Sequence, residues 1–282
     1  MITIKNEYIV AQISEKGAEL KSLKYNDFEY IWEADPAVWG SSSPVLFPIC
    51  GGLKDDKYTY EGNEYHLNKH GFVRREIFDV VEVAENVAEF SYKSNEMTRE
   101  RYPFEFDFRV KFELNNKDLS VTYSVVNLSE KDMYFNFGGH PAFACLEGIS
   151  SYDLKFEQKE TLDAYKVYGN LLSTETDRII TDTDVLHLKD ELFIVDSLLF
   201  KNINSKSVCL INKLNGRTVR FDYTGYDFLT IWTKPGAKYI CLEPWTGTPD
   251  FIGTDFDIKQ KYAIKSLSPK MMSSQTFVIG LE

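Results

Sequence analysis

The sequence predicts an all-β protein, either a sandwich or a barrel, and three observations lead to that fold class. Short runs of β-branched and aromatic residues recur along the whole chain and are separated by turn residues. One run, residues 104–114, alternates almost strictly between apolar and charged side chains, which is typical of a strand buried on one face. Helical patterns are few: residues 95–101 predict a turn or two that ends before Pro103, and residues 257–261 predict a single turn.

Hairpins account for much of the first half of the chain. The turn signals Asn26-Asp27 and Gly62-Asn63 each predict a short hairpin, and residues 115–118 join two longer strands. No break in composition divides the chain, so we expect one domain over residues 1–282. The expected strands are residues 2–4, 8–13, 19–25, 28–32, 45–49, 57–60, 64–67, 77–83, 87–94, 104–114, 119–126, 154–156, 198–200, 207–212, 218–223, 228–233, 238–242 and 275–281.

Composition excludes several classes of function. A formal net charge of -11 disfavours nucleic acids and anionic membranes as partners. No apolar stretch approaches the length of about 18 residues that a membrane span needs, and the N-terminus does not resemble a signal peptide. The four cysteines form no Cys-x-x-Cys pair, which predicts reduced thiols in a cytoplasmic protein.

Three stretches carry residues that handle protons. His140 lies in Gly-Gly-His-Pro, where the following proline favours extended geometry at a stiff bend. His70 lies in Lys-His-Gly-Phe-Val-Arg, and Glu243 ends an apolar strand just before Pro244. Two histidines and a carboxylate at the ends of elements are a candidate acid–base constellation. The alternatives are core histidines bonded to the backbone and a carboxylate in a salt bridge at a sheet edge.

The order of these motifs resembles the aldose 1-epimerase (galactose mutarotase-like) superfamily, and within it a bacterial branch with HGFAR and GHPAF motifs. Here they read Leu-Phe-Pro, His-Gly-Phe-Val-Arg, Gly-Gly-His-Pro-Ala-Phe and Leu-Glu-Pro-Trp-Thr-Gly, and the resemblance runs from Tyr8 to Ile279. It implies a large antiparallel sandwich of two sheets, a supersandwich, with the site in an open groove. It also implies an isomerase that needs no cofactor, takes a small sugar, and exists as a monomer or homodimer.

The resemblance assigns roles to the three residues. Interconverting the α and β anomers of an aldohexose opens the ring, so a base must take the proton of the anomeric hydroxyl and an acid must protonate the ring oxygen. Glu243 matches the base and His140 the acid, while His70 matches the histidine that bonds to the ring or anomeric oxygen. We expect both catalytic pKa values to be moved toward the working pH, and burial beside Trp245 to raise that of Glu243.

The resemblance also implies two substrate-binding residues. Arg74 matches the arginine of His-Gly-Phe-x-Arg, whose guanidinium holds sugar hydroxyls well, although it could pair with a carboxylate instead. Asp196 lies where members of the family often carry a substrate-binding aspartate. The chain departs from the pattern at Gly52, where relatives have an arginine, and Lys54 or Lys69 is the candidate replacement.

The identity of the sugar depends on the basic residues near the motifs. If residues 69–75 are extended, Arg74 and Arg75 point to opposite faces and only one reaches the groove. Because a phosphate group usually needs two convergent cations, we expect an unphosphorylated aldohexose. A hexose-6-phosphate mutarotase and a non-catalytic carbohydrate-binding protein remain the alternatives.

Two further questions about the histidines are whether they bind a metal and whether His66 and His187 have a functional role. A zinc site built from His70, His140 and Glu243 is chemically possible, but the spacings match no zinc signature, so we expect no metal. His66 and His187 match no motif, and we expect them on the surface.

Overall fold

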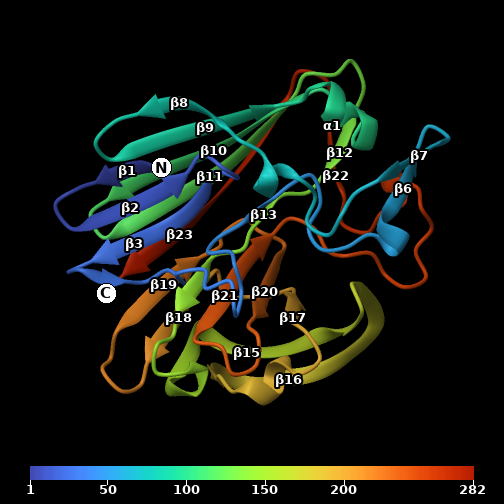
Figure 1. The fold of residues 1–282 in the computed structure, drawn as a ribbon. Helices are drawn as coiled ribbons and strands as arrows, with labels where there is room; N and C mark the ends of the chain where they lie inside the picture. The colour runs from blue at the N-terminus through green and yellow to red at the C-terminus, as the bar shows by residue number, and fades with distance from the viewer.

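The computed structural model describes residues 1–282, and it consists mainly of antiparallel sheets (Figure 1). A 15-stranded sheet runs in the order β5-β13-β21-β20-β17-β15-β18-β19-β23-β11-β10-β9-β8, with β14 beside β21 and β16 beside β15. A four-stranded sheet, β1-β2-β3-β4, and two two-stranded sheets complete the fold. The prediction of an all-β protein with large antiparallel sheets is therefore confirmed.

The elements have the following bounds: β1 Ile2–Lys5, β2 Ile9–Ser14, β3 Glu19–Tyr25, β4 Phe28–Glu29, β5 Val45–Leu46, β6 Lys57–Tyr60, β7 Asn63–His66, β8 Asp79–Val83, β9 Val87–Lys93, α1 Glu96–Arg101, β10 Phe106–Asn115, β11 Asp118–Asn127, β12 Met133–Phe135, β13 Gly138–Gly139, β14 Ala142–Ala144, β15 Tyr152–Tyr168, β16 Leu171–His187, β17 Leu198–Lys201, β18 Ser207–Asn212, β19 Thr218–Asp222, β20 Phe228–Trp232, β21 Tyr239–Trp245, β22 Lys265–Leu267 and β23 Met272–Leu281. Short 3-10 helices cover Lys54–Asp56, Val73–Arg75, Ile149–Ser151, Asp190–Phe193 and Ile258–Gln260. None of these helices has the length and apolar character that crossing a membrane requires.

Strands β10 and β11 form a hairpin in which the alternating sequence pattern corresponds to one buried and one more exposed face. They pair in register from Phe106 opposite Asn127 to Asn115 opposite Asp118, so the predicted long hairpin is confirmed. The phenylalanines of β10 are buried, while Glu113 on the other face is exposed. Each such ring contributes roughly 1.5–3 kcal/mol by leaving water.

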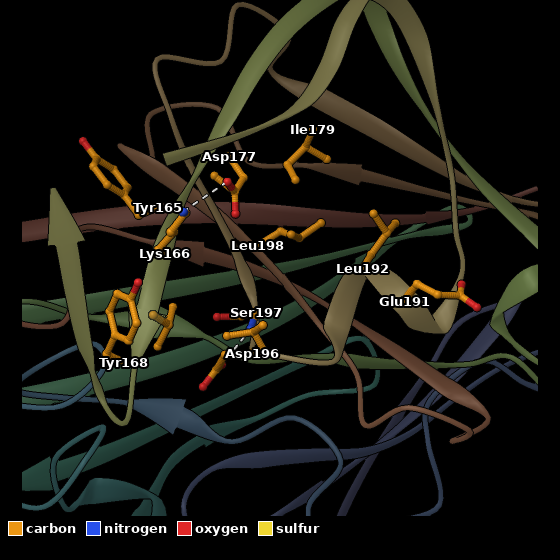
Figure 2. Close-up of a pocket in the computed structure, with 13 residues that line it drawn as sticks. Tyr165, Lys166, Tyr168, Asp177, Ile179, Glu191, Leu192, Asp196, Ser197 and Leu198 are labelled. Carbon is orange, nitrogen blue, oxygen red and sulfur yellow. Dashed lines mark hydrogen bonds and ion pairs between the residues drawn. The ribbon is translucent and has the colours of Figure 1, made fainter. Parts of the chain in front are cut away.

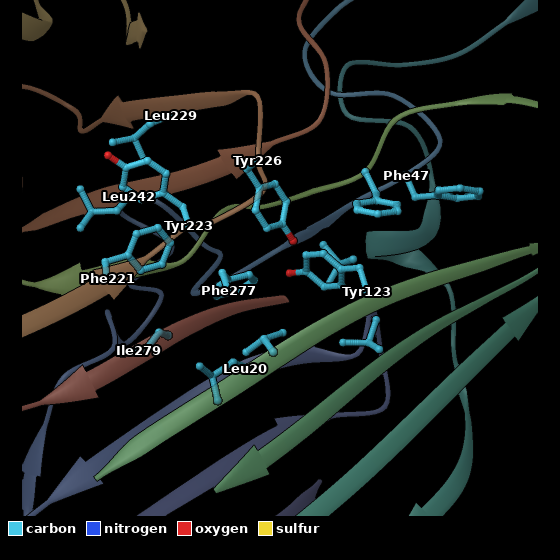
Figure 3. Close-up of a cluster of buried hydrophobic side chains, with 14 of the residues drawn as sticks. Leu20, Phe47, Tyr123, Phe221, Tyr223, Tyr226, Leu229, Leu242, Phe277 and Ile279 are labelled. Carbon is cyan, nitrogen blue, oxygen red and sulfur yellow. The ribbon is translucent and has the colours of Figure 1, made fainter. Parts of the chain in front are cut away.

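The core lies between the upper and lower strands of Figure 1 and is rich in aromatic rings (Figure 3). Phe277 of β23 packs 5.7 Å from Tyr123 of β11 and 5.5 Å from Phe221 of β19, measured between ring centroids. Tyr226 approaches the same ring from the turn before β20, at 6.4 Å. These contacts connect β11 and β23 with β19 and with the turn before β20. Strand β20 in turn pairs with β21, the strand that carries Glu243.

The largest departure from the sequence expectation is the hairpin of β15 and β16. Both strands have 17 residues, whereas only residues 154–156 were expected to be strand. Most of the side chains in β16 are polar and at least partly exposed, so the strand lacks the apolar alternation that marks a half-buried strand. Cross-strand ion pairs such as Arg178–Asp163 and Lys166–Glu175 accompany the backbone pairing.

One end of the strand order in the large sheet is the free edge of β8. All five residues of β8 are exposed, including Val80, Val81 and Val83. The pairing of β8 with β9 shifts register between Val80 and Glu82, which is a β-bulge at Val81.

Candidate active site

His140 and Glu243 are brought together by the register of the central strands. Gly138 in β13 pairs with Trp245 in β21, and Ala142 in β14 pairs with Cys241 in the same strand. His140 lies midway between the two paired positions on its segment, so it is placed opposite Glu243. Its Nε2 atom lies 3.3 Å from Oε2 of Glu243, and both residues are buried.

The glycines before His140 allow this close approach. A Cβ atom on Gly138 would lie 2.7 Å from Cδ1 of Trp245 and 2.9 Å from the carbonyl oxygen of Pro244. The two segments are also joined at Thr246, whose hydroxyl donates to the carbonyl of Phe137 and accepts from its N–H, both at 2.9 Å. The Gly-Gly-His-Pro and Glu-Pro-Trp-Thr motifs therefore form one packed unit.

His70 reaches the same place from a tight bend. His70 has φ 68° and Gly71 has φ 70°, and a Cβ on Gly71 would lie 2.1 Å from the carbonyl oxygen of Phe47. The Nδ1 atom of His70 accepts a hydrogen bond from the N–H of Gly51 at 3.1 Å. Neutral His70 therefore carries its hydrogen on Nε2, which leaves a donor for a ligand. The ring centroids of His70 and His140 are 5.7 Å apart.

The electrostatics of the pair agree only partly with the expectation. Burial raises the pKa of Glu243 well above its ordinary value, as expected, and the positive charge of Lys69 opposes this rise. Burial lowers the pKa of His140 to about 3, so the expected shift of the histidine toward the working pH was wrong. Both shifts favour the uncharged forms, a protonated carboxyl group on Glu243 and a neutral imidazole on His140.

Aromatic rings surround His140. Trp39 stacks on the imidazole with a centroid distance of 5.1 Å and an interplanar angle of 30°. Trp232 meets it edge-on at 5.6 Å and 88°. Sequence reasoning missed both tryptophans, because a loop residue and a strand residue far from the motifs carry no local signal.

Several buried polar atoms at the site have no partner. Nδ1 of His140, Oε2 of Glu243, Nε1 of Trp245 and Oγ1 of Thr230 make no hydrogen bond. Thr230 is the residue of β20 that pairs with Glu243, so its hydroxyl belongs to the same region. Unpaired buried polar atoms are rare in folded proteins, and a cluster of them is what a polyhydroxylated ligand would satisfy.

Arg74 and Arg75 are not on opposite faces of a strand. Val73–Arg75 is a 3-10 helix, so the condition of an extended segment, on which the opposite-face argument depended, is not met. Both arginines line one cavity of about 350 Å³, together with Lys16 and Lys21. Arg74 makes no ion pair or side-chain hydrogen bond, and its pKa is lowered by burial first and then by the charge of Arg75.

Asp196 lines a different cavity, of about 420 Å³, beside the β15–β16 hairpin (Figure 2). Its Oδ1 accepts from the N–H of Ser197 at 2.6 Å. Asp196 does not contact Glu243 directly, but its charge contributes to the raised pKa of that carboxyl. Its role in substrate binding stays a prediction.

Lys69 and Lys54, the two candidate replacements for the missing arginine, differ in their position relative to His140 and Glu243. The Nζ of Lys54 donates to the carbonyl of Thr254 at 3.3 Å and lies over the ring of Phe256, away from the histidines. The charge of Lys69 instead opposes the raised pKa of Glu243 and lowers that of His140. Lys69 is therefore the cation near the candidate pair.

Comparisons with known proteins show the family to which this chain belongs. The family model described as aldose 1-epimerase matches residues 1–257. The chain belongs to the aldose 1-epimerase family. It is 33% identical to the plasmid-encoded protein LacX of Lactococcus lactis subsp. lactis, over 99% of both chains.

Solved structures of similar proteins share the fold. A galactose mutarotase related enzyme from Lactobacillus acidophilus is 35% identical, with a TM-score of 0.95 over 100% of this chain and 97% of that chain. A galactose mutarotase-like protein from Lactobacillus casei is 29% identical, with a TM-score of 0.94 over 100% of both chains.

This member of the aldose 1-epimerase family also brings a potential metal donor set together. The ligand atoms of His140, Cys241 and Glu243 lie within 4.8 Å of one another, so the third member is a cysteine rather than His70. Burial raises the pKa values of both Cys241 and Glu243, which favours the protonated forms that do not bind a cation. The donor chemistry thus disfavours zinc.

The two other histidines lie outside this site, whereas one of the four cysteines, Cys241, lies beside the candidate pair. His66 and His187 are exposed, as expected. All four cysteines are free thiols, and Cys50, Cys145 and Cys241 are buried.

Proposed function

We propose that this protein is a cofactor-independent mutarotase that interconverts the α and β anomers of an aldohexose. The observation that carries the proposal is the pairing of His140 with Glu243, buried and 3.3 Å apart, each with an unpartnered polar atom. A carboxyl group and an imidazole that share one proton are sufficient for ring opening and closure.

The chemistry balances with two proton transfers in each direction. Glu243 takes the proton of the anomeric hydroxyl while His140 protonates the ring oxygen, so the bond from C1 to the ring oxygen breaks and C1 becomes an aldehyde. After rotation about the C1–C2 bond, the hydroxyl attacks the other face of C1. Its proton returns to His140, and Glu243 returns a proton to the anomeric oxygen. His70 donates from Nε2 to the oxygen that gains charge.

These roles need the shared proton to reside on His140 when the sugar reacts. Burial favours a neutral carboxylic acid on Glu243 and a neutral imidazole on His140. Moving the proton from Glu243 to His140 across the 3.3 Å gap creates the carboxylate base and the imidazolium acid together. Sugar hydroxyls that donate to Glu243 would stabilise this charged form, because hydrogen bonds to a carboxylate favour its ionised state.

Polarimetry on freshly dissolved α-glucose and α-galactose tests the proposal. A rate above the spontaneous one, abolished in Glu243→Gln, supports a mutarotase. A protein that binds these sugars in calorimetry without accelerating mutarotation is instead a carbohydrate-binding protein, and the proposal then fails.

A second candidate substrate, a hexose 6-phosphate, is favoured by the cavity that Lys16, Lys21, Arg74 and Arg75 line. Only Lys21 among these four cations has an ion-pair partner, Glu19 at 3.4 Å. Because Arg74 and Arg75 line the same cavity, which Glu19 also lines, the geometric reason for expecting an unphosphorylated sugar no longer holds. The comparison is between kcat/KM for glucose and for glucose 6-phosphate at low ionic strength. A preference for the ester that disappears in Arg75→Ala selects the phosphorylated substrate.

A further inference from the structure

His140 lacks the hydrogen bond that usually orients an imidazole in acid–base chemistry. In such sites the second ring nitrogen bonds to a carboxylate or carbonyl, which fixes the plane of the ring. Here Nδ1 of His140 has no partner among other residues, and Nε2 faces Glu243. The orientation of the ring must therefore come from packing.

Trp39 is the ring that lies against the imidazole, and it is itself held at several points. Its backbone N–H donates to the carbonyl of Asp35 at 2.8 Å, and its carbonyl accepts from Nε1 of Trp32 at 2.9 Å. Its indole stacks on Tyr239 at 5.3 Å and meets Trp232 edge-on at 5.4 Å. A side chain fixed through both backbone and ring can in turn fix its neighbour.

We propose that Trp39 is a positioning residue, and that its indole, in place of a hydrogen bond, sets the plane of the His140 ring toward Glu243. The role of Trp39 in catalysis rests on the proposed mutarotase function, whereas its role in orienting the His140 ring does not. Stacking also keeps water from one face of the imidazole. Without the indole the ring gains rotational freedom and hydration, so proton transfer to a bound sugar becomes misaligned.

The surroundings of His140 make the effect measurable by pH titration. Burial is the main cause of the low pKa of His140, the residue's own backbone opposes the lowering, and the charges of Arg74 and Lys69 add smaller lowering contributions. The other titratable groups beside the ring are Glu243, His70 and the thiol of Cys241. None of these groups is removed by a change at Trp39, so a rise in the pKa of His140 reports the admission of water.

The experiment compares Trp39→Ala with Trp39→Phe, which keeps a ring to stack. The chain has four histidines, so NMR of the imidazoles can follow His140 in each variant. We expect Trp39→Ala to raise the pKa of His140 toward ~6.5 and to lower kcat roughly tenfold to a hundredfold with a smaller change in KM. In Trp39→Phe, the pKa of His140 and kcat should both stay close to those of the natural protein.

Phe28→Ala serves as the control, since it truncates a half-buried ring that packs on Tyr30 and does not touch His140. It should leave the pKa of His140 and kcat unchanged. If Trp39→Ala leaves the pKa of His140 unchanged, or lowers only the melting temperature, the inference is overturned. If the unmodified protein shows no mutarotation, the proposed function fails, and the NMR titration still decides the role of Trp39.

Discussion

Nε2 of His140 lies 3.3 Å from Oε2 of Glu243 because the two residues occupy opposed positions in one antiparallel register. The pair is therefore fixed by backbone hydrogen bonding on both sides of it. Such a site tolerates isosteric changes of its side chains without loss of the fold, which makes the proposed roles accessible to mutation.

Glu243→Gln and His140→Asn each remove one proton-transferring group while keeping similar shape. We expect each to lower the mutarotation rate by at least about a hundredfold, the lower end of what a positioned acid or base contributes. Polarimetry measures the rate, and far-UV circular dichroism checks that the β-sheet spectrum is retained. A variant with a near-normal rate would remove that residue from the mechanism.

The stability of Glu243→Gln relative to the natural protein should depend on pH. The pKa of Glu243 is raised in the folded state, so above pH ~4.5 the unfolded chain loses a proton that the folded protein keeps. The natural protein therefore loses stability as pH rises toward the folded pKa, and the glutamine variant does not. Urea unfolding should show the advantage of the variant growing from pH 4 to pH 8; a constant difference would contradict a raised pKa.

Lys69→Ala should move the basic limb of the kcat/KM profile to higher pH. That limb reports loss of the shared proton, and the positive charge of Lys69 lowers the pKa of Glu243, so its removal raises that pKa. Lys54→Ala is the matched control, because the Lys54 amino group bonds to the carbonyl of Thr254. Equal shifts in both variants, or none in either, would argue against Lys69 as the relevant cation.

Gly71→Ala should destabilise the fold more than Gly62→Ala does. Both glycines have positive φ, 70° and 81°, so alanine costs roughly 1–2 kcal/mol at either site. At Gly62 the added Cβ meets nothing within 4 Å, whereas at Gly71 it would lie 2.1 Å from the carbonyl oxygen of Phe47. Denaturant melts of the two variants give the comparison, and similar midpoints would show that the bend around His70 can relax.

Sequence reasoning captured the elements whose apolar period is strong. Residues 104–114 alternate, and the structure places residues 106–114 in β10 with the apolar face buried. It missed the full length of β15 and all of β16, since a hairpin that carries charges on both strands has little apolar signal. Backbone pairing and cross-strand charges such as Arg178–Asp163 accompany that hairpin, and neither leaves a hydrophobic pattern.

In the candidate site, too, residues with a local sequence signal were predicted and residues without one were missed. His70, His140 and Glu243 stand in recognisable motifs, so they were found, and the structure brings them together. Trp39 was not found, because its relation to His140 exists only after separate segments have folded against each other. The low pKa of His140 was also missed, since burial on all sides cannot be seen from neighbours in sequence.

The bulge at Val81 has a consequence for self-association. A free sheet edge with three exposed valines is a template on which a strand of another molecule could grow, a common route to aggregation. The register shift at Val81 interrupts the row of unpaired backbone groups and twists the edge. Deleting Val81 would straighten β8, and the shortened protein should precipitate at concentrations at which the natural chain stays dispersed.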